Sequence, residues 1–146
     1  AAVRFAPHVT VTGPGDLPAE LTVLAEGRDS TTRERLGVRF EVSPYHQCGV
    51  AARLVADQPH GGLARQWFRS PDVLALLPFD RPQTGHGYGL VWSVPEARAD
   101  QLLAMSDAEF EAALAEATGG AAGPLALTGP RAAWPLTLAR AEPVFG

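Results

Sequence analysis

One pair of side chains in the sequence is suited to nucleophilic catalysis, a cysteine with a histidine two residues before it. Cys48 is the one cysteine among the 146 residues, and His46 would share a side of an extended strand with it. A cysteine nucleophile also needs a third group that orients its base, and the sequence places none nearby. A buried cysteine that packs as a small hydrophobic residue is therefore the favoured interpretation, and we expect no catalytic residue in this pair.

Neither the histidines nor the acidic residues are spaced like a metal site or an acid–base pair. The four histidines are His8, His46, His60 and His86. Their spacing matches no metal-ligand pattern, so we expect no bound metal. Asp107 and Glu109 follow Ser106 at the start of a predicted helix, where a capping role explains both carboxylates. The sequence contains no P-loop, no dinucleotide fingerprint and no nucleophile elbow.

The best candidate for a binding site is the turn at residues 26–33. Apolar residues at 21–25 predict a strand, which the following Gly27 ends. The next residues predict a short helix over 31–36. A strand that ends in glycine and leads into a capped helix gathers free backbone N–H groups at one point, where they can hold an anion.

A well-capped helix alone explains part of this turn. Asp29, Ser30 and Thr31 all offer oxygens for the N-cap. Thr31 and Glu34 have the spacing of a capping box, and Gly37 closes the helix. That interpretation does not explain why Glu26 precedes the glycine, or why Arg33 follows in the first helical turn. The turn is therefore a candidate anion site.

An aromatic-rich set on three successive predicted strands forms the second candidate. It consists of Trp67, Phe68, Phe79, Tyr88 and Trp92. Ordinary core packing is the favoured interpretation, and an apolar pocket for a flat ligand is the functional one. The residues that we assign to such a pocket are Gln66, Leu76, Pro78, Leu90 and Trp92. Gly87 and Gly89 leave one face of their strand thin, which indicates close approach of a ligand or another backbone.

The elements that must position these residues predict an α+β fold, with a mixed, mostly antiparallel sheet and helices on one of its faces. The predicted strands lie at 3–12, 21–25, 63–69, 73–79, 88–94, 124–128 and 132–139, and a further strand surrounds Val50–Leu54. The strand at 73–79 is apolar on both faces and is predicted to lie inside the sheet. Two helices are predicted between the sheet and the last strands, one from Pro95 to Met105 and one from Ser106 to Gly119.

Composition excludes several classes of partner. The net charge is −4 and no basic cluster occurs, which argues against nucleic acid. No apolar run reaches membrane-spanning length, and a single cysteine fits a reducing compartment. Lysine, isoleucine and asparagine are absent, while alanine, glycine, proline and arginine are plentiful. Because the missing residues use AT-rich codons, we infer a GC-rich bacterial genome.

Two sets of residues resemble a known family. Glu26-Gly27-x-x-Ser30-x-x-Arg33 is similar to the Asp-Gly-x-x-Ser-x-x-Arg motif of the single-component, FAD-dependent aromatic hydroxylases, with Glu26 in place of Asp. The segments 74–95, 105–119 and 131–141 resemble the ubiquinone-biosynthesis branch, the 2-octaprenyl-6-methoxyphenol hydroxylase type. The similarity extends over nearly the whole chain from Leu21 onward.

The resemblance implies a domain organisation and a site. Residues 1–37 correspond to a remnant of the FAD-binding domain, and 38–146 to the substrate-binding domain of a p-hydroxybenzoate-hydroxylase-like flavoprotein. The implied contacts with FAD are Glu26, Gly27, Ser30 and Arg33. The family's other flavin-holding motifs have no counterpart here, so we expect this chain to be a middle portion that binds no FAD and is inactive by itself.

The resemblance also implies a reaction. In that family NAD(P)H reduces FAD, which then reacts with O2 to hydroxylate an aromatic ring, so the cofactor carries the chemistry and the protein binds and orients. No arginine lies on the strand faces at 74–78 and 88–92, which favours a neutral prenylated phenol over an aromatic acid. Arg65 and Arg69 on the neighbouring strand leave an aromatic acid as an alternative.

Other expectations follow from the same resemblance. The protein would work in the bacterial cytoplasm, peripheral to the inner membrane or in a biosynthetic complex. Its partners would be the prenylated phenol and the remaining flavin-domain segments, and the chain alone would self-associate through exposed apolar residues. A non-enzymatic domain that binds an apolar ligand or a partner protein is the competing hypothesis.

Overall fold

The computed structural model describes residues 16, 20–81 and 83–144 of the chain. These residues fall into two compact units, one formed by the described residues up to 42 with those from 139 onward, and the other by those between 43 and 138. The predicted strand at 3–12 lies outside the described residues. The elements in chain order are α1 (Thr31–Arg35), β1 (Arg39–Ala56), β2 (Arg65–Arg69), β3 (Asp72–Phe79), β4 (Gly87–Pro95), α2 (Glu96–Ala104), α3 (Asp107–Thr118), β5 (Leu125–Leu127) and β6 (Ala132–Glu142).

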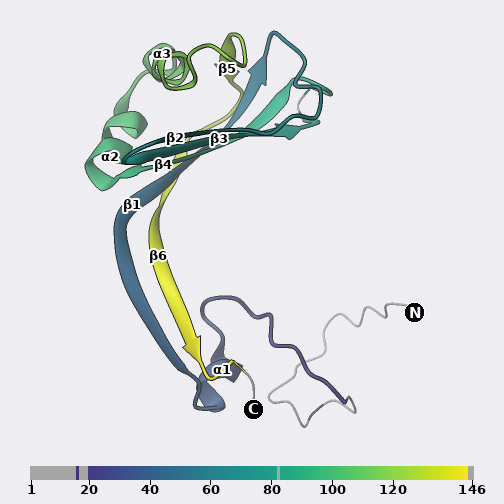
Figure 1. Ribbon diagram of the computed structural model, residues 1–146, viewed down its shortest axis with the longest axis vertical. Coiled ribbons are helices and arrows are strands. Elements are labelled where there is room, and N and C mark those ends of the chain that lie inside the picture. Colours follow the sequence, from purple (N-terminus) through teal and green to yellow (C-terminus); the bar gives the residue numbers. More distant parts are fainter. Residues whose placement is uncertain (1–15, 17–19, 82, 145–146) are drawn as a thin grey trace. The chain divides into compact units, whose positions relative to one another are not determined.

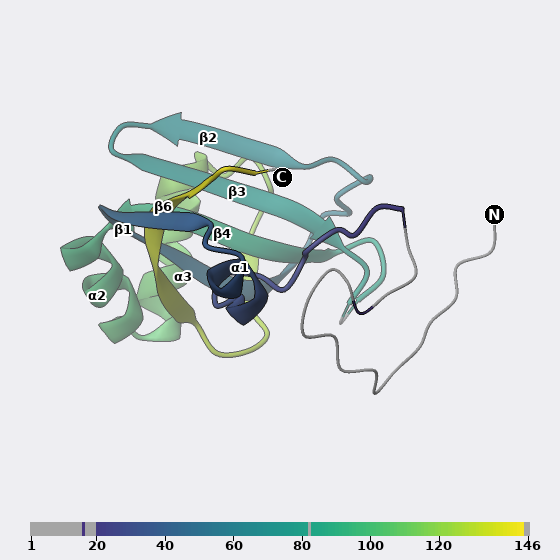
Figure 2. The same ribbon diagram turned by 90° about the horizontal axis from the view of Figure 1, so that it is seen from below.

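The larger unit is built on an antiparallel sheet, as predicted. The strand order is β2-β3-β4-β1-β5, and β6 also pairs with β1. β3 and β4 pair in a register that places Leu74 opposite Trp92 and Leu76 opposite Leu90. Figure 2 shows β2, β3 and β4 side by side. The interior position of β3 and the α+β class are therefore confirmed.

Helices α2 and α3 lie over one face of this sheet (Figure 1). Because strand side chains alternate between faces, the even-numbered residues of β3, β4 and the part of β1 from Cys48 onward point to the helices. The buried core they form with the helices consists mainly of Val50, Leu54, Leu74, Leu76, Tyr88, Leu90, Trp92, Val94, Leu102, Phe110 and Leu114. The odd-numbered residues lie on the opposite face, which we call the open face.

The two helices begin and end where the sequence predicts. Pro95 is the N-cap of α2, and Ser106 begins α3 with a complete capping box to Glu109. Those hydrogen bonds from Ser106 hold the pKa of the Glu109 carboxyl below its usual range. Gly119 ends α3 in the left-handed conformation, at φ 62°.

In the smaller unit the strand predicted at 21–25 is wrong. These residues form no strand, and the side chains of Leu21 and Val23 are 78% and 75% exposed. A strand requires a neighbouring chain to accept its hydrogen bonds, and none of the described residues pairs with this segment. Apolar periodicity carries no information about such a partner, which is why it predicted a strand here.

The short helix α1 is confirmed, but its predicted capping box is wrong. The N-cap is Ser30 and not Thr31, and its hydroxyl accepts a hydrogen bond from the Arg33 N–H at 3.1 Å. Ser30 is the N-cap because its backbone has the extended conformation that an N-cap residue adopts, at φ −66° and ψ 111°. Gly37 closes the helix at φ 69° and donates to the Glu34 carbonyl, as predicted.

Candidate functional site

The turn before α1 is organised around the Glu26 carboxylate. One carboxylate oxygen accepts a hydrogen bond from the Ser30 hydroxyl, and the other accepts one from the Thr32 hydroxyl at 2.8 Å. Residues Ser30 and Thr32 are almost fully buried, at 5% and 3% exposure. Hydrogen bonds from Ser30, then from Thr32, hold the pKa of Glu26 below its usual range.

Arg33 binds the other side of the same turn. Its guanidinium donates to the Gly27 carbonyl at 3.3 Å and to the Arg28 carbonyl at 2.7 Å. Its carbon Cζ lies 3.7 Å from the centre of the Phe40 ring, so the planar group is also stacked on an aromatic face. Gly27 supplies the φ of 83° that the turn needs, a conformation that only glycine adopts without strain.

This arrangement decides which part of a cofactor the turn can receive. The hydroxyls of Ser30 and Thr32 and the two terminal nitrogens of Arg33 already have partners within the turn, whereas the Arg33 Nε is buried without one in the described part of the chain. The group at the start of the helix is itself an anion, which repels a phosphate. These residues do not fit the phosphates of a dinucleotide. They fit a sugar hydroxyl, which can donate a hydrogen bond to the exposed Glu26 carboxylate.

A second candidate site is a hollow of about 520 Å³ on the open face of the sheet. Its walls are mostly apolar, and Leu77, Phe79 and Val91 are between 39% and 46% exposed there. The hollow is bordered by Ala51, Ala52, Arg53, Leu77, Phe79, Gly89, Leu90, Val91, Pro130, Ala132 and Trp134. A concave apolar surface with few polar groups is typical of a binding site for an apolar ring.

Arg53 is the charged residue that borders this hollow. It pairs with Gly89 across the β1–β4 ladder, and its guanidinium carbon lies 3.9 Å from the centre of the Phe79 ring on β3. A Cβ atom at Gly89 would lie 3.9 Å from the Arg53 Nη1 atom. The glycine therefore lets the arginine cross β4 close to the backbone and reach the phenyl ring.

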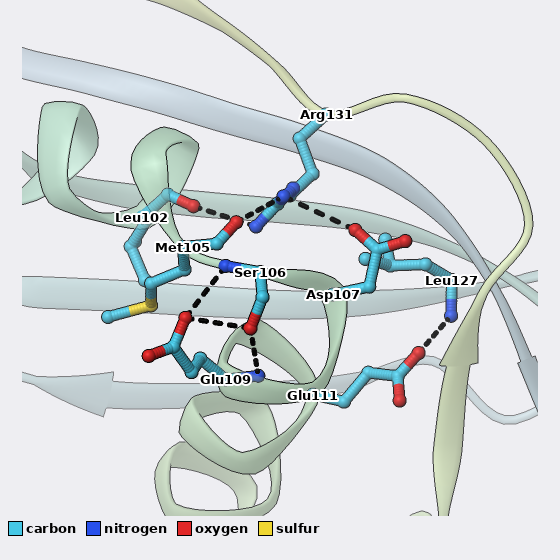
Figure 3. Close-up of polar contacts among 8 residues, drawn as sticks. All are labelled: Leu102, Met105, Ser106, Asp107, Glu109, Glu111, Leu127 and Arg131. Carbon is cyan, nitrogen blue, oxygen red and sulfur yellow. Dashed lines mark hydrogen bonds and ion pairs between the residues drawn. The ribbon is translucent and has the colours of Figure 1, made fainter.

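The last wall of the hollow is positioned by Arg131, which precedes Ala132 and Trp134. Its guanidinium donates to the Leu102 carbonyl at 3.0 Å and to the Met105 carbonyl at 2.6 Å, both at the end of α2 (Figure 3). It also pairs with Asp107 at 3.3 Å. These contacts fix the start of β6 to the junction of the two helices.

A neighbouring contact fixes β5 to α3. The Glu111 carboxylate accepts a hydrogen bond from the Leu127 N–H at 2.8 Å (Figure 3). Glu111 thus holds the β5 end of the turn between β5 and β6, and Arg131 attaches the β6 end to the helices. Together these contacts fix the rim of the hollow.

The residues assigned to a pocket from sequence do not lie together. Leu76, Leu90 and Trp92 are buried on the helix-covered face, whereas Gln66 pairs with Ala75 on the open face. Leu90 borders the open-face hollow, and Trp92 borders a smaller cavity of about 180 Å³ beneath α3. Pro78 is half-buried opposite Tyr88. The part of this set in substrate binding stays a prediction.

The two arginines considered as carboxylate ligands lie on the helix-covered side. Arg65 pairs with Leu76 in the β2–β3 ladder and donates to the Tyr88 hydroxyl at 2.7 Å. Arg69 borders the smaller cavity and donates to the Glu116 carbonyl at 3.4 Å. Sequence reasoning missed Arg53, although its place between Ala52 and Leu54 in an alternating strand was the signal that could have found it.

Cys48 is not arranged as a nucleophile. Burial raises the pKa of its thiol, with Glu96 and Asp100 adding to the effect, which disfavours the reactive thiolate. His46 lies at φ 55°, a kink that breaks the regular alternation between the two residues.

Among the described residues, no three His, Cys, Asp or Glu side chains form a group that could hold a metal ion. No helix in the described part of the chain is long and apolar enough to cross a membrane.

Comparison with known proteins assigns the chain to a class. The chain is 31% identical over 124 residues to the ubiquinone hydroxylase UbiL of Rhodospirillum rubrum, which covers 85% of this chain and 28% of that protein. It is 30% identical over 104 residues to the mitochondrial ubiquinone biosynthesis monooxygenase COQ6 of Rattus norvegicus, which covers 70% of this chain and 21% of that protein. An uncharacterized protein of Synechocystis is 27% identical over 128 residues, 86% of this chain and 30% of its own length. No protein-family model matches.

These relatives define a class of hydroxylases and monooxygenases named for ubiquinone biosynthesis. The chain belongs to this ubiquinone-biosynthesis hydroxylase branch, which confirms the resemblance seen in its motifs. It spans less than a third of the length of each of the three relatives.

Proposed function

We propose that this chain is the substrate-binding portion of an FAD-dependent monooxygenase that hydroxylates the aromatic ring of a prenylated phenol in ubiquinone biosynthesis. The observation that carries the proposal is the apolar hollow on the open face of the sheet, in a chain related to ubiquinone hydroxylases. An apolar wall binds a prenylated ring by removing both from water, at roughly 25 cal/mol per Å² of apolar surface buried.

The proposed division of labour follows the chain. Residues 1–37 would contribute to the FAD-binding domain and residues 38–146 to the substrate domain. FAD, reduced by NAD(P)H, would supply the oxygen chemistry. Leu77, Phe79 and Val91 would orient the ring and exclude water from it.

The proposed cofactor contacts are the residues of the turn before α1. The Glu26 carboxylate would accept a hydrogen bond from a sugar hydroxyl of FAD. Gly27 would supply the backbone conformation that the turn needs. Ser30 would hold the Glu26 carboxylate in place, and Arg33 would hold the turn. Because these are few contacts and none suits a phosphate, the chain alone should bind FAD weakly. Tight stoichiometric quenching of flavin fluorescence by this chain would contradict that assignment.

The proposal extends to partners and location. Apolar side chains such as Leu21 and Val23 are exposed here and would be covered by further segments of the flavin domain. The same exposure predicts self-association of the chain alone, which light scattering would detect. A prenylated substrate is held by membranes, so we place the whole protein in the bacterial cytoplasm, peripheral to the inner membrane or in a biosynthetic complex.

A chimera tests the function. The segment of Rhodospirillum rubrum UbiL that aligns with this chain is replaced by this chain, in a strain that lacks its own UbiL. Restored ubiquinone, measured by mass spectrometry of extracted quinones, is the expected result. A chimera that folds and carries FAD but yields no hydroxylated ring would contradict the proposal. A chimera with Val91→Glu and Leu77→Glu is the matched negative control, because it charges the hollow without touching the core.

A further inference from the structure

We infer that Arg53 makes the open-face hollow selective for an aromatic ring that carries an anionic oxygen, a phenolate. This inference rests on the proposed function, because it assigns the substrate's ionisation state within the same hollow. It adds a specificity-determining residue that motif and pattern did not indicate.

The first observation is electrostatic. Arg53 is the charged residue among those that border the hollow, and it is exposed there. Within the described part of the chain, its guanidinium contacts the Phe79 ring and makes no hydrogen bond or ion pair. An arginine with all its N–H donors free, on an otherwise apolar surface, is complementary to an oxygen anion.

The second observation is geometric. The Arg53 guanidinium carbon lies 3.9 Å from the centre of the Phe79 ring, and a Cβ atom at Gly89 would lie 3.9 Å from its Nη1 atom, so the group lies close to the sheet. The strand ladders place Arg53, Gly89 and Leu77 in one row across β1, β4 and β3, so the N–H donors of Arg53 lie beside the apolar floor of the hollow. A ring lying on Leu77 and Val91 would meet these donors with an oxygen at its edge.

The consequence for a bound phenol is a change of ionisation. The phenol O–H bond breaks, the proton passes to solvent water, and the phenolate oxygen accepts hydrogen bonds from the guanidinium. No oxidant, reductant or further reactant is needed. An opposite charge at hydrogen-bond distance favours the charged form, and at a partly exposed site we expect the pKa of the phenol to fall by about 1 on binding.

Two probes measure this selectivity. 4-Nitrophenol can ionise, and 4-nitroanisole has the same ring with its oxygen methylated. Each is titrated into the 146-residue chain, and the absorbance of 4-nitrophenolate is followed against pH with and without protein. We expect the phenolate to bind about tenfold more tightly than neutral 4-nitrophenol, which is the free-energy difference of the expected pKa shift, and 4-nitroanisole to bind like the neutral phenol.

Three variants assign the effect to one residue. Arg53→Met should abolish the preference for the phenolate and leave 4-nitroanisole binding unchanged. Arg53→Lys should keep part of it, because the charge remains while the fork and the stacking are lost. Arg69→Met removes the same charge from the helix-covered side and should change nothing. Far-ultraviolet circular dichroism checks that each variant folds.

Each outcome has one meaning. A phenolate preference that Arg53→Met keeps, or that the parent chain lacks while still binding 4-nitroanisole, overturns the assignment of Arg53 and leaves the proposed hollow intact. Failure of both probes to bind overturns the proposed hollow itself, and the role of Arg53 with it. A preference lost in Arg53→Met and kept in Arg69→Met supports the inference.

Discussion

The two faces of the sheet in the larger unit are built from alternate residues of the same strands, yet they differ in almost every respect. On β3, Leu76 is fully buried and the next residue, Leu77, is 46% exposed. On β4, Trp92 is 3% exposed and Val91 is 42% exposed. The covered face has two helices upon it, and the open face carries apolar side chains, a glycine and an arginine with no acidic partner in the described chain.

The difference shows how one sheet separates stability from binding. The covered face gains its free energy from apolar burial against α2 and α3, so its residues are replaceable only at a large cost. The open face contributes little to folding because its side chains remain in contact with water, so its residues are available for a ligand.

The largest expected effect separates two adjacent leucines. Leu76→Ala should lower the free energy of unfolding by about 2–5 kcal/mol, because it leaves a cavity in a closely packed core. Leu77→Ala should lower it by less than about 1 kcal/mol, since that side chain is half in water already. Urea denaturation of both variants measures the difference. Equal losses would show that the open-face side chain contributes as much to the free energy of unfolding as the buried one.

Two glycines of β4 give the next comparison. A Cβ at Gly87 would lie 2.3 Å from the Phe79 carbonyl oxygen, a backbone atom that cannot move aside easily. Gly87→Ala should therefore destabilise the fold by about 1–3 kcal/mol. At Gly89 the nearest atoms lie 3.9 and 4.0 Å away, so Gly89→Ala should fold normally and alter only the floor of the hollow. Thermal melts of the two variants decide between these expectations, and a destabilised Gly89→Ala would contradict the open character of that face.

Arg131 links the helix-covered side to the rim of the hollow. Arg131→Met would leave the Leu102 and Met105 carbonyls without their donor, at a cost of about 1–3 kcal/mol. Arg98→Met is the matched control, because Arg98 makes one exposed hydrogen bond to Gln101 and should cost less than about 1 kcal/mol. Denaturant titration ranks the two, and an equal ranking would remove Arg131 from its proposed role at the rim.

The smallest effect concerns the turn before α1, where the hydroxyls of Ser30 and Thr32 are both paired with the Glu26 carboxylate. Because the folded-state pKa of Glu26 is depressed, the stability that its hydrogen bonds give is present above its unfolded pKa and is lost as pH falls through the folded value. Ser30→Ala should raise the pKa of Glu26 toward its usual range, since the first of its two donors is removed. An NMR titration of the Glu26 side-chain carboxyl in both proteins follows this, with Thr31→Ala as a control that leaves both donors. An unchanged titration midpoint in Ser30→Ala would contradict the assigned contacts.

The sequence predicted most elements of the larger unit, for a physical reason. Alternation in the strands, the capping box at Ser106 and the glycine after α3 are local signals, and local signals suffice for local structure. The antiparallel sheet and the class of protein followed from them and from the motifs. Register did not, and register decides which residues share a face.

The candidate site was harder to predict for the same reason. The pocket predicted from sequence combined Gln66 of one face with Leu76, Leu90 and Trp92 of the other. The sequence does not give the pairing register of β2, β3 and β4, which decides the face of each residue. Arg53 reaches Phe79 across an intervening strand, a contact that no sequence spacing encodes. Likewise the apolar segment at 21–25 predicted a strand, but only a pairing partner makes a strand.

The most direct test of this account is to locate a bound phenol on the sheet. Backbone amide shifts of the isotope-labelled chain are recorded by NMR while 2-prenylphenol is added. The account predicts that the shifted amides cluster on the open face, at Arg53, Leu77, Phe79, Gly89 and Val91. Shifts centred instead on Trp67, Ala113 and Glu116, which border the smaller cavity beneath α3, would place the ligand on the helix-covered side and contradict the account.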